Sequence, residues 1–345
     1  MNAALLGLNV CVAVITLLGL GYVARVRMPR PPVGKYEAAD VLVAMVVVMV
    51  APLLYLELPR TAVAVVFGLV LCAALQFTLA PLLGGLRAAV LAVVAVAATG
   101  GLALADRTLA VLVLTDVLLA VAVVGVAAMW AQSGFRSVHA AWFAGLLAVY
   151  DLVATGLTSV MDRFATQVMG LPFAPLLAVT RGDPPVALGL GDLLLIVLFP
   201  MVAAKAFGRA AALLAGALGV LASSAVSVLF ATGTLTGAFP LMVVLGPVIV
   251  AQHLYWIRRT GRERTTAQWR AGAIATPPAP TAPPPLHAAL GPLTDPAHLR
   301  DQARTTGGWL AVLDGEIVGT GPTPGTARKD AARRGTGAVP LVRRA

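Results

Sequence analysis

Residues 186–207 read VALGLGDLLLIVLFPMVAAKAF, and this stretch decides the fold class. Its only ionisable side chains are those of Asp192 and Lys205; every other residue in it is apolar, glycine or proline. An α-helix needs about 20 predominantly apolar residues to cross the hydrocarbon core of a bilayer. The stretch therefore predicts a membrane-spanning helix with an aspartate close to one end.

Most of the remaining sequence has the same character. Hydrophobic residues make up 59% of the 345 and charged residues 12%, whereas a globular protein carries about 25% charge. Two cysteines are too few for a disulfide scaffold. We expect an all-α polytopic membrane protein with nine transmembrane helices, at 3–23, 39–56, 61–83, 88–105, 108–131, 137–159, 186–207, 210–232 and 238–257.

The net charge of +10 is concentrated towards the C-terminus. Thirteen basic and six acidic residues lie from position 258 onward, against twelve and nine before it. Loops on one side of the predicted spans hold twelve Lys and Arg, and loops on the other side hold four. Because cytoplasmic loops are the basic ones, we expect a multi-pass cell-membrane protein with its N-terminus outside and its C-terminal tail in the cytoplasm.

The sequence predicts three parts. A membrane domain occupies 1–264, a proline-rich linker 265–297 and a small soluble domain 298–345. The linker contains ATPPAPTAPPPL at 275–286, which is typical of an extended polyproline spacer.

The soluble domain is predicted to be a small α+β module of ββαβ order. Its first two strands are joined by Asp314-Gly315, a hairpin turn signal. The expected elements are strands at 308–313 and 316–320, a helix at 324–334 ended by Gly335, and a strand at 338–342. A docking or stabilising module without catalytic activity fits this pattern best.

Charged groups at membrane depth are costly, so each one is a candidate functional residue. Asp40 and Lys205 lie near span ends, where their side chains are expected to reach the interface. Asp116 lies about a third of the way into the fifth span, as a structural or functional aspartate. Asp151 and Asp192 lie at matched depths, about 10 Å below the same surface, in two antiparallel spans.

Two features place Asp151 and Asp192 in a plausible pair. Ala144 and Ala148 share a helical face with Asp151, and a face of small residues lets a neighbouring helix approach closely. Gly189 and Gly191 loosen the helix that carries Asp192 and give water access. The alternative at this point is two unrelated structural aspartates.

A pair of this kind has a definite chemistry. Two neighbouring carboxyl groups in a low-dielectric site cannot both ionise cheaply, so they share one proton. The charged member acts as general base on a water, and the protonated member polarises the carbonyl and later donates to the leaving amine. This hydrolyses a peptide bond without a metal or a cofactor, and we expect neither.

At these residues the sequence resembles the intramembrane aspartyl proteases, the family of presenilin and signal peptide peptidase. That family carries Tyr-Asp in its sixth span and Gly-x-Gly-Asp in its seventh; here Tyr150-Asp151 and Gly189-Leu190-Gly191-Asp192 match. The resemblance covers residues 137–257. It implies a presenilin-like membrane domain, catalytic Asp151 and Asp192, and a site shaped by Tyr150, Gly189, Leu190 and Gly191.

The third family motif, Pro-Ala-Leu in the ninth span, is present in altered form. Pro240-Leu241-Met242 stands in its place, and the resemblance assigns these residues to the site. Because leucine replaces a small residue, we expect a looser approach of the ninth span and a narrower site. The expected orientation is similar to that of signal peptide peptidase, which implies lipid-embedded substrates: transmembrane helices with a cytoplasmic N-terminus, or signal-peptide remnants.

Three other interpretations are alternatives to an intramembrane aspartyl protease. A secondary transporter also uses intramembrane aspartates and broken helices. Type IV prepilin peptidases carry Gly-x-Gly-Asp, but followed by a lysine-containing stretch where this chain has Leu193-Leu194-Leu195. A scaffold with a decayed site is the third. No basic stripe with interleaved aromatic residues occurs, so nucleic acid is not an expected partner.

Overall fold

The computed structural model describes residues 3–28, 38–179, 187–235, 239–272, 308–313, 316–333 and 340–344. The chain divides into two compact units, Met1–Thr276 and Pro277–Ala345, with the division inside the predicted linker. The proline-rich run 275–286, the Asp314-Gly315 turn and Gly335 lie outside the described residues. The two units are described separately.

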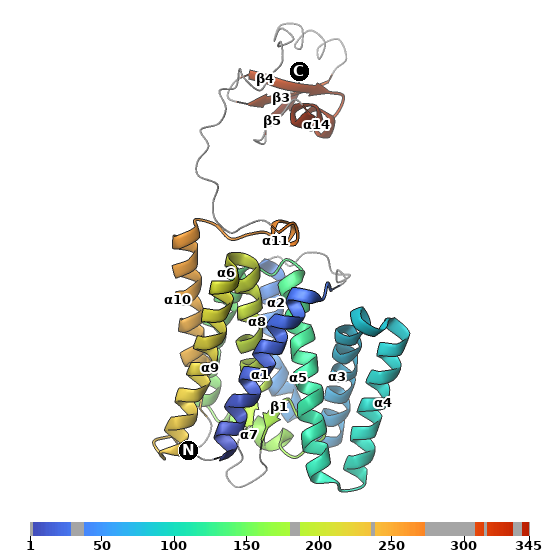
Figure 1. Cartoon of the computed structure of the whole chain (residues 1–345), viewed down its shortest axis with the longest axis vertical. Helices are drawn as coiled ribbons and strands as arrows, with labels where there is room; N and C mark the ends of the chain where they lie inside the picture. The colour runs from blue at the N-terminus through green and yellow to red at the C-terminus, as the bar shows by residue number, and fades with distance from the viewer. Residues whose placement is uncertain are drawn as a thin grey trace. The chain divides into compact units, whose positions relative to one another are not determined.

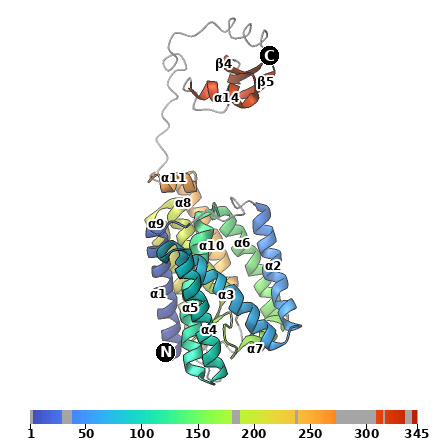
Figure 2. The ribbon, with the colours of Figure 1, turned by 90° about the vertical axis from the view of Figure 1, so that its right-hand side faces the viewer.

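The first unit is a bundle of helices (Figures 1 and 2). The helices are α1 Ala3–Arg25, α2 Ala38–Leu56, α3 Arg60–Leu83, α4 Gly85–Leu104, α5 Thr108–Gln132, α6 Ser137–Asp151, α7 Val160–Val168, α8 Leu190–Phe207, α9 Arg209–Ala231, α10 Met242–Thr260 and α11 Thr266–Arg270. A π-helical segment, η1 Leu152–Leu157, continues α6. Within the described residues, eight helices are long and apolar enough to cross a membrane, which confirms the predicted membrane character.

The ninth predicted span also forms a helix, but a more polar one. It begins at Met242, so Pro240 and Leu241 precede it. Its second half carries Gln252 and His253 and ends with Arg258 and Arg259, and α10 is therefore not among the eight helices with membrane-like hydropathy.

Burial separates central helices from peripheral ones. Of the most apolar 18 residues of α8, 72% are buried inside the unit, against 11% for α2. Apolar side chains that face outward, such as Leu69 on α3 and Val93 on α4, are more than half exposed. A helix that is apolar all round belongs in lipid when it is not surrounded by protein. The bundle is thus organised around α8, with a lipid-facing periphery.

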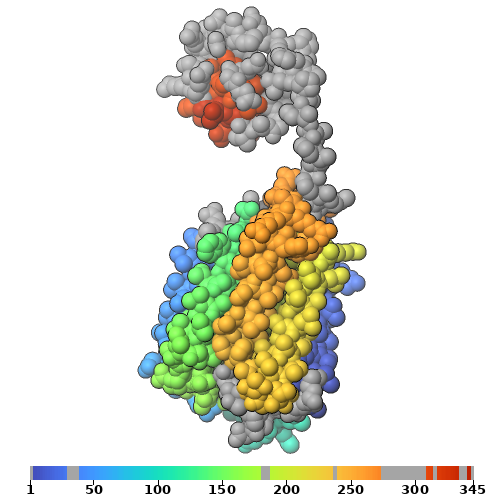
Figure 3. All heavy atoms as spheres, turned by 90° about the vertical axis from the view of Figure 1, so that its left-hand side faces the viewer, coloured from blue at the N-terminus to red at the C-terminus, as the bar shows by residue number. Residues whose placement is uncertain are grey.

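The main apolar core lies around α8; it is built mostly from residues of α1, α5, α6, α8, α9 and α10 and includes Val41 and Met45 of α2. A second, smaller cluster joins α3, α4 and α5 through Leu71, Ala92 and Leu118. Figure 1 shows α3 and α4 to one side of the bundle, in agreement with this division. Figure 3 shows α10 in orange between α6 in green and α9 in yellow.

The expectation that the membrane domain is wholly α-helical is wrong in one place. Strands β1 Leu176–Ala178 and β2 Ala187–Gly189 pair antiparallel, with Leu177 opposite Leu188. The seventh helix consequently begins at Leu190 rather than at 186. Strands of three residues are too short for an alternating pattern to stand out from a continuous apolar run.

The second unit is a small α+β module, as predicted. Its sheet has the order β4-β3-β5, all antiparallel, with helix α14 Pro324–Arg333 packed on it. The strands are β3 Trp309–Leu313, β4 Glu316–Gly321 and β5 Leu341–Arg344, so the third strand starts three residues later than expected. Gly319 allows close packing, because a Cβ there would lie 2.6 Å from the Ala327 carbonyl oxygen of α14.

Candidate active site

Asp151 is the last α-helical residue of α6, and the helix changes to π geometry directly after it. The side-chain hydroxyl of Thr155, within the π-helical segment, donates to Asp151 Oδ1 at 2.9 Å. Single π turns inside α-helices are rare and occur frequently at functional sites. The local irregularity thus coincides with the carboxylate that the sequence singles out.

Asp192 lies in the first turn of α8, immediately after the β1–β2 hairpin. Gly189 is the N-cap of α8, in extended conformation, and the N–H of Leu190 donates to the Pro175 carbonyl at 3.0 Å. The carboxylate of Asp192 lies close to Gly189, since a Cβ on that glycine would be 3.3 Å from Asp192 Oδ2. The side chain of Asp192 is half-buried and that of the next residue, Leu193, is completely buried.

The two predicted carboxyl groups belong to one electrostatic environment. Asp151 is near enough for its negative charge to be felt at Asp192, and α6 packs against α8. Both side chains are half-buried, so water screens their repulsion less than at the protein surface. The structure therefore places the two aspartates on contacting helices, within electrostatic range of each other.

The third motif reaches the site through its backbone. The N–H of Met242 donates to Asp151 Oδ2 at 3.0 Å. Met242 is the first residue of α10, and the first N–H groups of a helix have no partner within it and favour a negative charge. The Leu241 and Met242 side chains are buried, and the Pro240 carbonyl accepts from the Val243 N–H at 3.1 Å.

The small-residue face of α6 packs against α10, not chiefly against α8. A Cβ added to Gly246 of α10 would lie 2.7 Å from both the Ala144 carbonyl oxygen and the Ala148 Cβ. The ninth helix thus approaches α6 closely at Gly246, through a glycine outside the altered third motif. The small-residue pattern marks Ala144 and Ala148 in the sequence, but no pattern marks the glycine opposite them.

The other motif residues lie around the pair in different ways. The Tyr150 hydroxyl donates to the Met49 carbonyl of α2 at 3.2 Å, so this side chain ties α6 to a peripheral helix. Gly191 faces open space: apart from its chain neighbours and the backbone of its own helix, no described atom lies within 4 Å of where its Cβ would be. Leu190 is half-buried at the start of α8. Space beside Asp192 is therefore available on the Gly191 side.

Two further ionisable residues of the predicted spans, Lys205 and Asp116, make hydrogen bonds with backbone groups. Lys205 does not reach the interface: its side chain is 3% exposed, and its Nζ donates to the carbonyls of Ala131 at 2.8 Å and Phe135 at 2.5 Å. Asp116 on α5 accepts a hydrogen bond from the Ala178 N–H of β1 at 3.1 Å.

In the described part of the chain, no group of three or more His, Cys, Asp or Glu is placed to hold a metal ion.

Comparison of the chain with protein-family models, with curated proteins and with solved structures gives no match.

Proposed function

We propose that this chain is an intramembrane aspartyl protease of the presenilin and signal peptide peptidase type. It hydrolyses peptide bonds within transmembrane helices or signal-peptide remnants. The observation that carries the proposal is the carboxyl pair: Asp151 and Asp192 come from different, contacting helices and lie within electrostatic range of each other, with open space at Gly191 next to Asp192. The altered third motif supports it, because Met242 bonds to one member of the pair.

The hydrogen bonds distinguish the two carboxyl groups. Asp151 accepts from Thr155 and from the helix N-terminus at Met242, whereas Asp192, in the first turn of α8, has no such donors among the described residues. Donors stabilise a carboxylate in its ionised form. We therefore assign the general base to Asp151 and the shared proton to Asp192.

The reaction follows from that assignment. Asp151 removes a proton from water as the water oxygen bonds to the carbonyl carbon, and Asp192 gives its proton to the carbonyl oxygen. The resulting gem-diol collapses when the proton on Asp151 passes to the amide nitrogen and a diol proton returns to Asp192. The carbon–nitrogen bond breaks, and the pair regains its initial state.

A substrate helix must unwind before its carbonyl is attacked, and its backbone groups then need partners inside the membrane. In the described sheet, β2 pairs with β1 on one side and leads directly to Gly189 and Asp192. Extended peptides bind to such strands by adding a strand at the open edge. The second edge of β2 is therefore the proposed site where the unwound segment lies.

We also propose that α10 crosses the membrane as a ninth span, with the N-terminus outside and the tail in the cytoplasm. The basic residues at the end of α10 support this orientation, because Arg258 and Arg259 then lie on the cytoplasmic side. Reporter fusions after residue 28 and after residue 265 test it. Cytoplasmic reporter activity at both positions supports the orientation, and an external reporter at 265 contradicts it.

Cleavage is tested with purified protein in detergent or vesicles and a fluorogenic peptide that contains one transmembrane helix. Mass spectrometry of the products locates the cut, which must lie within the apolar segment. A peptide mimic with a hydroxyl at the scissile position is expected to inhibit, because it resembles the tetrahedral gem-diol. Proton-coupled uptake by reconstituted vesicles that ignores this mimic would favour a transporter instead.

A further inference from the structure

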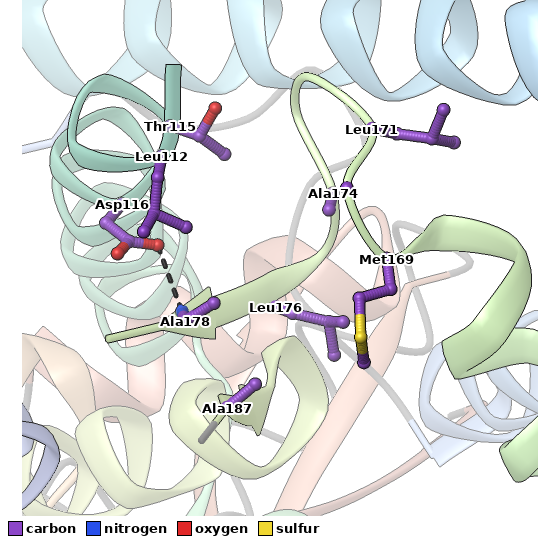
Figure 4. A pocket seen from close by; sticks show the side chains of 10 residues that line it. Leu112, Thr115, Asp116, Met169, Leu171, Ala174, Leu176, Ala178 and Ala187 are labelled. Carbon is purple, nitrogen blue, oxygen red and sulfur yellow. Dashed lines mark hydrogen bonds between the residues drawn. The ribbon is translucent and has the colours of Figure 1, made fainter. Parts of the chain in front are cut away.

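Asp116 lies outside the carboxyl pair, on α5, and its carboxylate meets the edge of β1. Its Oδ1 accepts from the backbone N–H of Ala178 at 3.1 Å, the bond drawn as a dashed line in Figure 4. Ala178 is the last residue of β1. Its N–H is therefore directed to α5 and away from β2, so the carboxylate occupies the outer edge of the hairpin.

The hairpin transmits this contact to the start of α8. Ala178 stands opposite Ala187, and Leu176 stands opposite Gly189, the N-cap of α8. At the far end of β1, the Leu190 N–H donates to the Pro175 carbonyl. Asp192 follows two residues later, within the first turn of α8. A shift of β1 along α5 would thus shift the backbone that carries Asp192.

A second contact from α5 holds the chain that enters the hairpin. The N–H of Phe173 donates to Thr115 Oγ1 at 3.4 Å. Phe173 has φ +64, which is uncommon for a residue with a side chain, and its ring packs where a Cβ on Gly68 would be 3.1 Å away. Neighbouring side chains on α5, Thr115 and Asp116, therefore each accept from a backbone N–H of segment 173–178.

The packing between α5 and the hairpin is incomplete. A cavity of about 280 Å³ lies there, lined by Leu112, Thr115, Asp116 and residues of the 169–178 segment and β2. Figure 4 shows Asp116 on one side of this cavity and Leu176 and Met169 on the other. Because close packing does not fix the hairpin on this side, the hydrogen bond from Ala178 to Asp116 is a specific contact that holds β1 to α5 there.

We infer that Asp116 is a positioning residue: through the Ala178 N–H it fixes β1 on α5, and through β2 it sets the place of Asp192. The inference rests on the proposed proteolytic function. Asp116 does not touch the reacting atoms in this role. What it contributes is an acceptor oxygen in a fixed place, and neither its charge nor a proton is required.

This role separates two substitutions. Asp116→Asn keeps an Oδ1 acceptor, so it is expected to retain most of the cleavage rate. Asp116→Ala removes the acceptor, and kcat is expected to fall on the order of 10- to 100-fold, because small misplacements of catalytic groups are that costly. KM is expected to change little. Asp162→Ala, which removes an exposed carboxylate on α7, is the matched control and is expected to behave as wild type.

Hydrogen–deuterium exchange provides a readout that does not depend on activity. Peptides that cover residues 174–179 are expected to exchange faster in Asp116→Ala than in wild type, and at the wild-type rate in Asp116→Asn. Asp192→Asn is expected to reduce kcat by about 10²- to 10⁴-fold and to leave this exchange unchanged. Thr115→Val, which removes the longer bond to Phe173, is expected to accelerate exchange over 171–174 with less effect on kcat.

The outcomes separate the two proposals. If wild type cleaves nothing but Asp116→Ala accelerates exchange over 174–179, the proteolytic function fails and the anchoring of β1 stands. If Asp116→Asn loses as much kcat as Asp116→Ala, the charge of Asp116 matters and the positioning role is overturned. It is also overturned if Asp116→Ala changes neither kcat nor exchange. A variant that elutes as aggregate is replaced by Asp116→Ser, which is too short to reach Ala178 and is expected to behave as Asp116→Ala.

Discussion

The backbone N–H of Met242 donates to Asp151 Oδ2 at 3.0 Å, which joins the beginning of α10 to the end of α6. Met242, in the altered third motif, therefore contacts the candidate base Asp151 through its backbone N–H, a group that every amino acid except proline has. The same helices approach closely at Gly246 and Ala144. The position of the Asp151 carboxylate thus depends on how α10 packs against α6 as well as on the geometry of α6 itself.

Thr155 is expected to matter through its hydroxyl alone. Thr155→Val keeps the branched shape and removes the donor to Asp151 Oδ1, so the ionised base loses a hydrogen bond to a charged group. We expect kcat to fall about 10-fold, the equivalent of one such bond. Thr155→Ser, measured in the same peptide-cleavage assay, should restore most of the rate; equal losses in both variants would show that packing dominates.

Gly246 and Gly145 form a matched pair for the contact between α6 and α10. A Cβ on Gly246 would lie 2.7 Å from the Ala144 carbonyl oxygen, whereas one on Gly145 would lie 3.8 Å from Val250 Cγ2. Gly246→Ala is expected to destabilise the fold by about 1–3 kcal/mol through overpacking and to reduce cleavage. Gly145→Ala should leave both unchanged. Thermal unfolding of the two variants in one detergent measures the difference, and equal melting temperatures would contradict it.

Glu263 is expected to make stability depend on pH at the other end of these helices. Its carboxylate accepts from the Ser137 N–H at 2.8 Å and the Ser137 hydroxyl at 2.6 Å, and it pairs with Arg136. Burial alone would raise the pKa of Glu263, but these bonds outweigh burial and hold the pKa below its ordinary value of 4.5. The stabilisation is therefore complete above that value and is lost as the pH falls through the lower folded-state pKa.

The measurement compares wild type with Glu263→Gln from pH 7 down to about pH 3, because the loss occurs below the ordinary pKa. At pH 7 the variant should be less stable by about 2 kcal/mol, as expected for hydrogen bonds to a charged group. The difference in melting temperature should narrow as the pH falls below about 4.5. A constant difference across the range would show that the ionised carboxylate of Glu263 does not stabilise the fold.

Lys205 is predicted to be structural. Its buried Nζ donates to two carbonyls, at Ala131 and Phe135, at the end of α5 and just beyond it. Lys205→Met leaves both acceptors without this donor, so we expect a loss of about 1–3 kcal/mol in the free energy of unfolding. Arg209→Met removes an exposed cation nearby and should change stability by less than about 0.5 kcal/mol. Similar unfolding curves for the two variants would contradict this role.

The elements that the sequence predicts well are those with long, uniform patterns. Runs such as 186–207 are apolar over the length of a bilayer, so the spans were predictable within a few residues except where local hydrogen bonding changes the backbone. The helix at Asp192 starts late because residues 187–189 pair with β1. Asp151 and Asp192 stand out because charge inside an apolar run is rare.

The contacts that the sequence does not reveal are mostly made by backbone atoms. Met242 and Ala178 act through their N–H groups, and no side-chain type marks such a contact. Gly246 is one of 34 glycines, and only its close contact with α6 in the folded structure distinguishes it from the others. Lys205 lies where an interfacial lysine is expected, and its burial depends on how α5 ends beside α8. Such pairings between distant segments require the tertiary structure.

Cleavage by the single variants Asp151→Asn and Asp192→Asn tests the carboxyl pair most directly. Purified wild type, the two variants and Asp162→Asn as control are incubated with the same transmembrane-helix peptide. We predict that each of the two variants loses about 10²- to 10⁴-fold in kcat, that the double variant is no worse than either, and that the control cleaves at the wild-type rate. Full activity in either single variant would contradict a shared mechanism of Asp151 and Asp192.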